Sequence, residues 1–102
     1  MPTNKYKIRF LKIAEEDFAE IVLFIAAENP IAADRIATKI EKNIELLSEN
    51  PFLGRTPRDE EIKNLRYRYL IVQDYIVFYT IENKTIFIHR ILHGARNYKS
   101  IL

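Results

Sequence analysis

Residues 14–47 read AEEDFAEIVLFIAAENPIAADRIATKIEKNIELL, and this stretch decides the fold. Its apolar residues recur every three or four positions, which is the period of a helix with one face in a core. Asn29-Pro30 interrupts the pattern, because Asn29 can cap a new helix and Pro30 fits a first helical position, where no amide donor is needed. The stretch therefore predicts an αα-hairpin, two helices joined by a very short link. The two apolar stripes are Ala14, Phe18, Ile21, Val22 and Ile25, then Ala33, Ile36, Ala37, Ile40, Ile44 and Leu47.

Both ends of this hairpin carry further signals. The acidic triplet Glu15-Glu16-Asp17 is expected in the first turn of the first helix, where the helix dipole favours negative charge. Asn50-Pro51 is expected to end the second helix. Residues 51–64 then contain two prolines, Gly54 and six charged side chains, so we expect a polar loop there.

Alternating and continuous apolar runs predict four strands, at residues 6–10, 66–71, 75–81 and 85–92. The run at 75–81 is apolar on both faces, as in a central strand. Glu82-Asn83-Lys84 predicts a tight turn with Asn83 in the left-handed conformation. Residues 93–102 form a tail, which Gly94 is expected to bend away from the sheet. The predicted fold is α+β with the order β-α-α-β-β-β, a helical hairpin packed on a mostly antiparallel four-stranded sheet.

Length and composition limit the classes of protein that fit. A chain of 102 residues predicts a single domain, residues 1–102. The absence of cysteine excludes a disulfide scaffold and is typical of a cytoplasmic protein. No run approaches the roughly 18 apolar residues of a membrane span, so we expect no membrane association.

Charge is distributed unevenly along the chain. Residues 1–50 hold seven basic and nine acidic side chains, a net charge of −2, whereas residues 51–102 hold nine and five, a net charge of +4. Such a basic half suggests an acidic partner, either nucleic acid or an acidic protein segment, although a mildly basic surface without a partner remains an alternative.

Metal and cofactor sites are not expected. His89 and His93 have the spacing H-x-x-x-H, but on a strand four residues span about 13 Å, too far for two ligands of one zinc ion. The only glycines are Gly54 and Gly94, so there is no glycine-rich phosphate loop. We therefore expect no metal and no cofactor.

The remaining candidate site is a basic cluster. Strand alternation puts Arg66 and Arg68 on one face, with Tyr67, Tyr69 and Ile71 expected on the other, facing the helices. Arginine forks suit phosphate and carboxylate groups, and a metal-free ribonuclease could use them with histidine or tyrosine as proton carriers. Arginines on an exposed face can equally serve solubility alone. The expected target-binding residues are Arg66, Arg68, Arg90, His93, Arg96 and Tyr98.

Over residues 6–102 the chain resembles the RelE/ParE family of toxins from bacterial toxin–antitoxin pairs. The resemblance implies the same β-α-α-β-β-β fold and a cognate antitoxin that wraps the toxin in a hetero-oligomer. The segments that carry it are Asn29-Pro30-Ile31-Ala32-Ala33, Asn50-Pro51-Phe52-Leu53-Gly54, Tyr75-Ile76-Val77-Phe78-Tyr79 and Arg90-Ile91-Leu92-His93-Gly94-Ala95-Arg96-Asn97-Tyr98.

The family is divided in activity, and two residue patterns favour its ParE branch, whose members poison DNA gyrase and block replication. The members of the other branch cleave mRNA on the ribosome, and they use an arginine at the position that Ile76 occupies here. The aliphatic side chain of Ile76 cannot stabilise a pentavalent phosphate. The run from Arg90 to Arg96 also resembles the ParE branch more closely.

Two alternatives stay open beside gyrase inhibition. The first is a ribosome-dependent mRNA interferase using Arg66, Arg68, His93, Arg96 and Tyr98, since the last two match basic and aromatic positions of the interferase tail. The second is a family member that binds antitoxin but has lost toxicity.

An antitoxin-binding surface is expected on the helical hairpin. Leu23 and Phe24 lie outside the core-facing stripe, and a partner helix or strand could cover such surplus apolar surface. The alternative is that a second edge of the core buries them.

Overall fold

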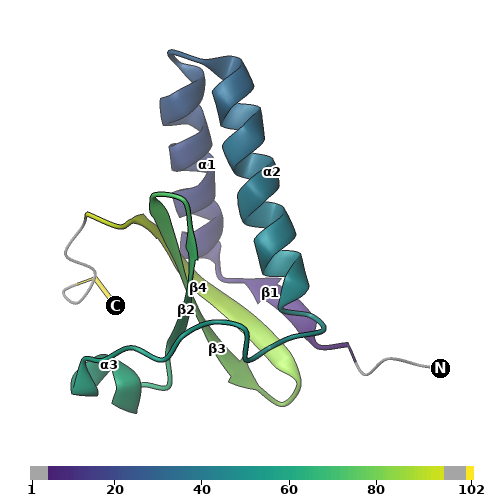
Figure 1. Cartoon of the computed structure of the whole chain (residues 1–102), viewed down its shortest axis with the longest axis vertical. Coiled ribbons are helices and arrows are strands. Elements are labelled where there is room, and N and C mark those ends of the chain that lie inside the picture. The colour runs from purple at the N-terminus through teal and green to yellow at the C-terminus, as the bar shows by residue number, and fades with distance from the viewer. Residues whose placement is uncertain (1–4, 96–100) are drawn as a thin grey trace.

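The computed structural model describes residues 5–95 and 101–102, and it places a long helical hairpin on one face of a four-stranded sheet (Figure 1). The far end of the hairpin projects beyond the strands, so that its tip is distant from the sheet (Figure 1). The elements are β1 (Lys7–Phe10), α1 (Lys12–Ala26), α2 (Pro30–Leu46), α3 (Glu60–Asn64), β2 (Arg68–Val72), β3 (Tyr75–Glu82) and β4 (Thr85–His93). The predicted fold class is confirmed.

The sheet has the strand order β1-β4-β3-β2. β1 pairs with β4 in parallel, while the β2–β3 and β3–β4 pairs are antiparallel, which makes the sheet mostly antiparallel as predicted. The two-residue turn between β3 and β4 consists of Asn83 and Lys84, with φ of 48° and 60°. The left-handed Asn83 is therefore confirmed, and such a turn matches the twist of the strands it joins.

The two long helices start for different reasons. At α2, the Asn29 Oδ1 accepts a hydrogen bond of 3.0 Å from the Ala32 amide, and Pro30 occupies the first helical position, as predicted. At α1, the helix begins at Lys12, two residues before the apolar stripe, so only Glu15 of the acidic triplet lies in the first turn. Asp17 lies one turn further on, where it has another role described below.

The main core lies between the hairpin and the sheet. Ile40 from α2, Val77 and Tyr79 from β3, and Ile86 and Ile88 from β4 are fully buried. The predicted stripe of α2 supplies Ala33, Ile36, Ile40, Ile44 and Leu47 to the buried residues, which confirms the phase of that helix. None of the helices in the described ranges is long and apolar enough to span a membrane.

The expected polar loop at residues 51–64 contains a short helix, so that prediction was wrong for its second half. α3 is capped by Asp59, whose Oδ1 accepts hydrogen bonds from the amides of Glu61 and Ile62. Ile62 is 2% exposed, and its burial fixes the helix against the sheet. Five residues are too few for a helical period to be visible in the sequence.

The orientation predicted for β2 was also wrong. The strand starts at Arg68, and Arg66 lies before it in a turn with φ of 65°. Leu70 and Val72 belong to the core under the helices, whereas Ile71 is 54% exposed on the opposite face. Both faces of this segment carry apolar side chains, so alternation alone could not decide which face is inward.

A bulge at His89 changes the alternation of β4. Tyr79 pairs with Ile88 and Phe78 pairs with Arg90, which leaves His89 as the extra residue. In a regular strand, residues three positions apart lie on opposite faces. Because of the bulge, Ile88 and Ile91 both lie in the core on the helix side, together with Ile86. Such an insertion redirects the side chains beyond it, and here it re-aims the part of β4 that carries Arg90.

Candidate functional site

Arg90 is bound to a carboxylate of α1. Its Nε donates to the Asp17 Oδ2 at 2.7 Å and its Nη2 donates to Oδ1 at 2.8 Å, while the backbone amide of Ile91 donates to Oδ2 at 3.0 Å. The hydrogen bonds to Asp17 raise the pKa of Arg90 above its usual value. The side chains are 16% and 11% exposed, so this two-pronged pair is largely withdrawn from water.

Arg68 is bound to the segment before α3. Its Nη2 donates to the carbonyl oxygens of Gly54 at 2.7 Å and Phe52 at 3.1 Å, and its Nη1 donates to the Thr56 Oγ1 at 3.2 Å. The guanidinium carbon also lies 5.3 Å from the centre of the Phe52 ring. The side chain therefore holds residues 52–56 against the edge of the sheet.

Tyr79 anchors the same segment from the core. Its hydroxyl donates to the Pro51 carbonyl at 2.9 Å and accepts from the Gly54 amide at 2.9 Å. A Cβ at Gly54 would lie 2.5 Å from that hydroxyl, so only glycine allows this close approach. The segment that presents Phe52 is thus fixed from two sides.

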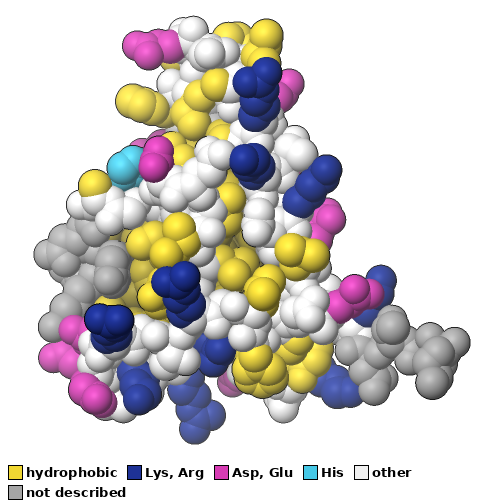
Figure 2. Space-filling view, viewed as in Figure 1, with side chains coloured by type: hydrophobic (Ala, Val, Ile, Leu, Met, Phe, Trp, Pro, Cys, Tyr) yellow, Lys and Arg dark blue, Asp and Glu magenta, His cyan; other side chains and the backbone are white. Residues whose placement is uncertain are grey.

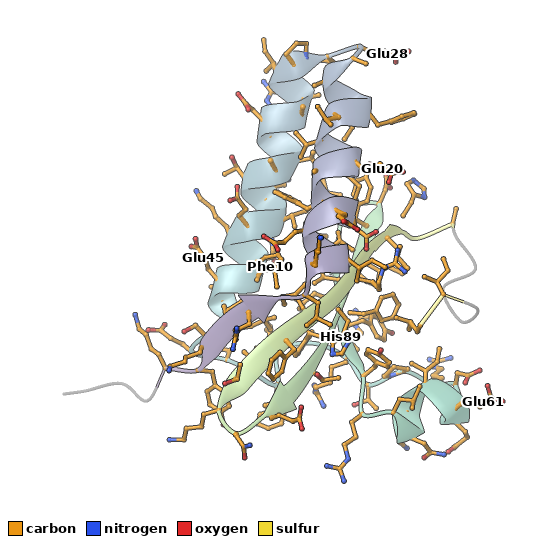
Figure 3. All side chains as sticks on the ribbon, turned by 180° about the vertical axis from the view of Figure 1, so that it is seen from behind. Phe10, Glu20, Glu28, Glu45, Glu61 and His89 are labelled. Carbon is orange, nitrogen blue, oxygen red and sulfur yellow. The ribbon has the colours of Figure 1, made fainter. Side chains whose placement is uncertain are left out.

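A polar network on the face away from the helices centres on His89, which Figure 3 labels on β4. Its Nε2 is 2.8 Å from the Thr80 Oγ1 and its Nδ1 is 3.4 Å from the Tyr67 hydroxyl. Burial lowers the pKa of His89, and burial raises the pKa of Tyr67. Both shifts favour the neutral forms, so these groups are arranged to bond each other.

The predicted basic cluster is divided in the structure. Arg66 and Arg68 line one shallow hollow, whereas Arg90 is bound to Asp17. His93 is exposed at the end of β4, where its ring packs edge-on against Tyr75 and its Nδ1 accepts from the Ala95 amide. Arg96 and Tyr98 lie outside the described residues.

Leu23 and Phe24 are exposed on α1, at 70% and 80%. Ile31, just beyond the turn of the hairpin, is 66% exposed. Figure 2 shows apolar side chains at the surface of the projecting hairpin. Phe24 also borders a hollow of about 230 Å³ between α1 and the ends of β3 and β4, lined in part by Glu20, Tyr75 and His93.

Sequence reasoning missed three residues around these sites. Asp17 interrupts the apolar stripe three residues after Ala14 and four before Ile21, and that position was a signal for a buried partner. Phe52 and Lys63 line the hollow of Arg66 and Arg68, but nothing in their spacing predicts this. Within the described ranges, no three His, Asp or Glu side chains gather as metal ligands would.

Solved structures show where this fold occurs. The chromosomal ParDE system of P. aeruginosa aligns with a TM-score of 0.73 at 18% identity, covering 88% of this chain and 97% of that one. The RelBE2 toxin–antitoxin complex of Mycobacterium tuberculosis aligns with a TM-score of 0.62 at 21% identity, covering 93% and 98%. A conserved hypothetical protein of Helicobacter pylori aligns with a TM-score of 0.57 at 13% identity, covering 89% and 97%. The fold is that of the RelE/ParE toxins.

The sequence places the chain more narrowly. Residues 8–98 match the family described as the ParE toxin of the type II toxin–antitoxin system parDE. No curated protein sequence matches the chain. The family match spans most of the sequence, and the chain belongs to this toxin family.

Proposed function

We propose that this toxin inhibits DNA gyrase by binding, without performing chemistry, and that a cognate antitoxin neutralises it. The observation that carries the proposal is that the guanidinium groups of Arg68 and Arg90 are hydrogen-bonded within the protein. Both guanidinium groups already bond protein oxygens, three in the case of Arg68 and a carboxylate in the case of Arg90. Neither is free to stabilise the charge of a phosphoryl transition state, which needs donors aimed at the reacting group.

The residue at the centre of β3 supports the same proposal. Ile76 is half-buried and borders a hollow together with Phe78 and Ile62, and Arg58 and Asp59 also line it. The interferases that the chain resembles carry an arginine at this position to stabilise the phosphorane, and the branched aliphatic side chain of Ile76 supplies no charge in its place. The described part of the sheet face is therefore better suited to contact than to catalysis.

The antitoxin part of the proposal rests on the hairpin. Leu23, Phe24 and Ile31 expose large apolar side chains on an element that projects from the sheet. Exposed apolar residues grouped in this way mark protein interfaces, and an amphipathic helix or an extended segment of the antitoxin would bury them. Two of the structural neighbours are toxin–antitoxin systems, which agrees with such a partner.

The deciding experiment tests the two possible targets side by side. Purified toxin is added to gyrase with relaxed plasmid, and separately to translating ribosomes with a reporter mRNA. We expect inhibition of supercoiling, its reversal by the antitoxin, and no new mRNA ends by primer extension. Unaffected supercoiling at excess toxin would exclude gyrase, and toxin-dependent cuts in the translated mRNA would establish the interferase instead. Arg66→Gln and His93→Gln, two exposed changes, then test whether these side chains contact the target.

A further inference from the structure

A hollow of about 220 Å³ lies where the turn after α3 meets β2, and its lining is basic and aromatic. Lys63, Arg66 and Arg68 contribute three cations, and none of the lining residues is acidic. The remaining lining residues are Phe52, Thr56, Tyr67 and Ile81. Figure 2 shows basic side chains on the part of the molecule that carries α3 and β2, with acidic side chains at its outer edge.

The charge of Arg68 is not neutralised within the described residues. Its hydrogen bonds go to two carbonyl oxygens and one hydroxyl, all uncharged, and its Nε is buried without a hydrogen-bond partner there. Neither the Lys5–Glu49 ion pair nor the Arg90–Asp17 ion pair includes a residue of this hollow. A half-buried guanidinium without a counter-charge raises the positive potential of its surroundings, because the local dielectric is low.

Lys63 and Arg66 add two further positive charges beside that of Arg68. Both side chains are exposed, on the last turn of α3 and in the turn that follows. Arg66 has a φ of 65°, which is uncommon for a residue other than glycine, asparagine or aspartate. The backbone of the turn therefore sets the direction of its Cα–Cβ bond. Two exposed donors beside a fixed positive charge suit a ligand with several anionic oxygens.

The exposed ring of Phe52 favours a nucleic acid over an acidic peptide as the anionic ligand. Its side chain is 65% exposed, although its backbone carbonyl is fixed by Arg68, so an aromatic face is presented to solvent at the rim of the hollow. Cations together with an exposed aromatic ring are the combination that binds unpaired nucleic acid, where the cations contact the phosphate and the ring stacks on a base. An acidic peptide would use the charges but not the ring.

We propose that this hollow binds a phosphate of a DNA strand through Lys63 and Arg66, beside the fixed positive charge of Arg68, with Phe52 stacking on the adjacent unpaired base. The proposal goes beyond gyrase inhibition, because it concerns a contact that the toxin makes with DNA itself. The hollow lies beside α3 and is distant from the tip of the hairpin, which Figure 3 marks with Glu61 and Glu28 respectively, so DNA and a partner on that tip occupy different surfaces.

The test measures binding of the free toxin to fluorescein-labelled single-stranded DNA by fluorescence anisotropy, between about 50 and 200 mM salt. The variant Lys63→Gln/Arg66→Gln removes two charges from the hollow, and Arg35→Gln/Lys39→Gln, both exposed on α2, removes two charges elsewhere. We expect the first variant to lose at least about tenfold in affinity and its salt slope to fall by about 1.4, at about 0.7 per charge on a single strand, with the control close to the unmodified toxin.

A second variant tests the aromatic contact. Phe52→Leu keeps an apolar side chain but removes the ring face, so affinity for single-stranded DNA should fall while affinity for duplex DNA stays the same. Equal losses in both double variants would mean diffuse attraction and would overturn the proposal. Binding of a polyglutamate peptide in place of DNA would identify an acidic protein as the ligand. Because gyrase is absent from this assay, its outcome is independent of the supercoiling test.

Discussion

Asp17 of α1 binds Arg90 of β4 across 73 residues of sequence, and the same carboxylate accepts the backbone amide of Ile91. The last β1–β4 pair is Phe10 with Ile88, and the next residue, Leu11, donates its amide to the Ile88 carbonyl, so the edge of β4 beyond that point lacks a strand partner. Asp17 supplies the acceptor that a longer β1 would have supplied. The pair therefore joins the hairpin to the sheet at the place where the sheet pairing ends.

Asp17→Ala should destabilise the fold by about 3 kcal/mol or more, because it leaves a largely buried guanidinium and an amide without their acceptor. Asp17→Asn should cost less, since an amide oxygen can still accept from Ile91. Urea denaturation measures both, with Glu16→Ala, an exposed neighbour, as the control. An unchanged midpoint for Asp17→Ala would show that the pair contributes nothing to stability.

Tyr79→Phe should cost about 1–3 kcal/mol, because both the Gly54 amide and the Pro51 carbonyl lose their buried partner. Gly54→Ala should be at least as damaging, since its Cβ would collide with the Tyr79 hydroxyl and the Tyr69 carbonyl. Thermal unfolding gives the comparison, and Tyr75→Phe, half-buried on the same strand, is the matched control. Equal effects at positions 75 and 79 would refute the anchoring role.

Arg68→Lys should destabilise the segment at residues 52–56, although the charge is kept. A lysine ammonium cannot reach three acceptors arranged around a planar fork, so we expect a loss of about 1–2 kcal/mol and faster amide exchange at Arg55. The Arg55 amide bonds the Tyr69 carbonyl at 2.8 Å, which makes it a local reporter. Arg66→Lys, in the exposed turn, should leave both measurements unchanged.

The pH dependence of stability should contain a contribution from His89. Burial lowers its pKa below the 6.5 of the unfolded chain, so the unfolded state binds the proton more readily. This contribution is fully present above about pH 6.5 and is lost as the pH falls from there toward the folded-state pKa. Denaturation at pH 7.5 and at lower pH should show a decrease in stability that is smaller in His89→Gln. Equal decreases in both proteins would contradict the assignment.

Leu23→Gln/Phe24→Gln should weaken binding of the antitoxin by more than tenfold and leave the melting temperature of the toxin unchanged, because both side chains are exposed in the free protein. Isothermal titration calorimetry with the antitoxin measures the effect. Leu65→Gln, which changes a 58% exposed side chain after α3, is the control for a general loss of apolar surface. Wild-type affinity in the double variant would place the interface elsewhere.

Several features of the fold were predictable because their causes are local. The Asn29 cap, the proline after it and the left-handed Asn83 each depend on interactions within three or four residues. The helix α2 was predicted in phase, because its buried residues recur with the helical period. The buried face of β2 was predicted wrongly, since this strand carries apolar or aromatic side chains on both faces, at Tyr69, Leu70, Ile71 and Val72.

The candidate sites were less predictable than the fold. Arg68 and Arg90 were expected to face a target, and the structure places both guanidinium groups on internal oxygens. Their partners, at Gly54 and Asp17, are separated from them by 14 and 73 residues. The position of Leu23 and Phe24 outside the apolar stripe left both exposure and burial by a second core edge open, and the structure shows that they are exposed.

The amino-acid sequence by itself determined the helical hairpin, the strands and the tight turn, because periodicity and backbone preference act within a few residues of chain. Only the tertiary structure decided which face of β2 is buried, that a bulge at His89 redirects β4, and that Asp17 receives Arg90. These depend on hydrogen bonds and packing between distant segments. Their geometry exists only once the sheet has closed against the hairpin.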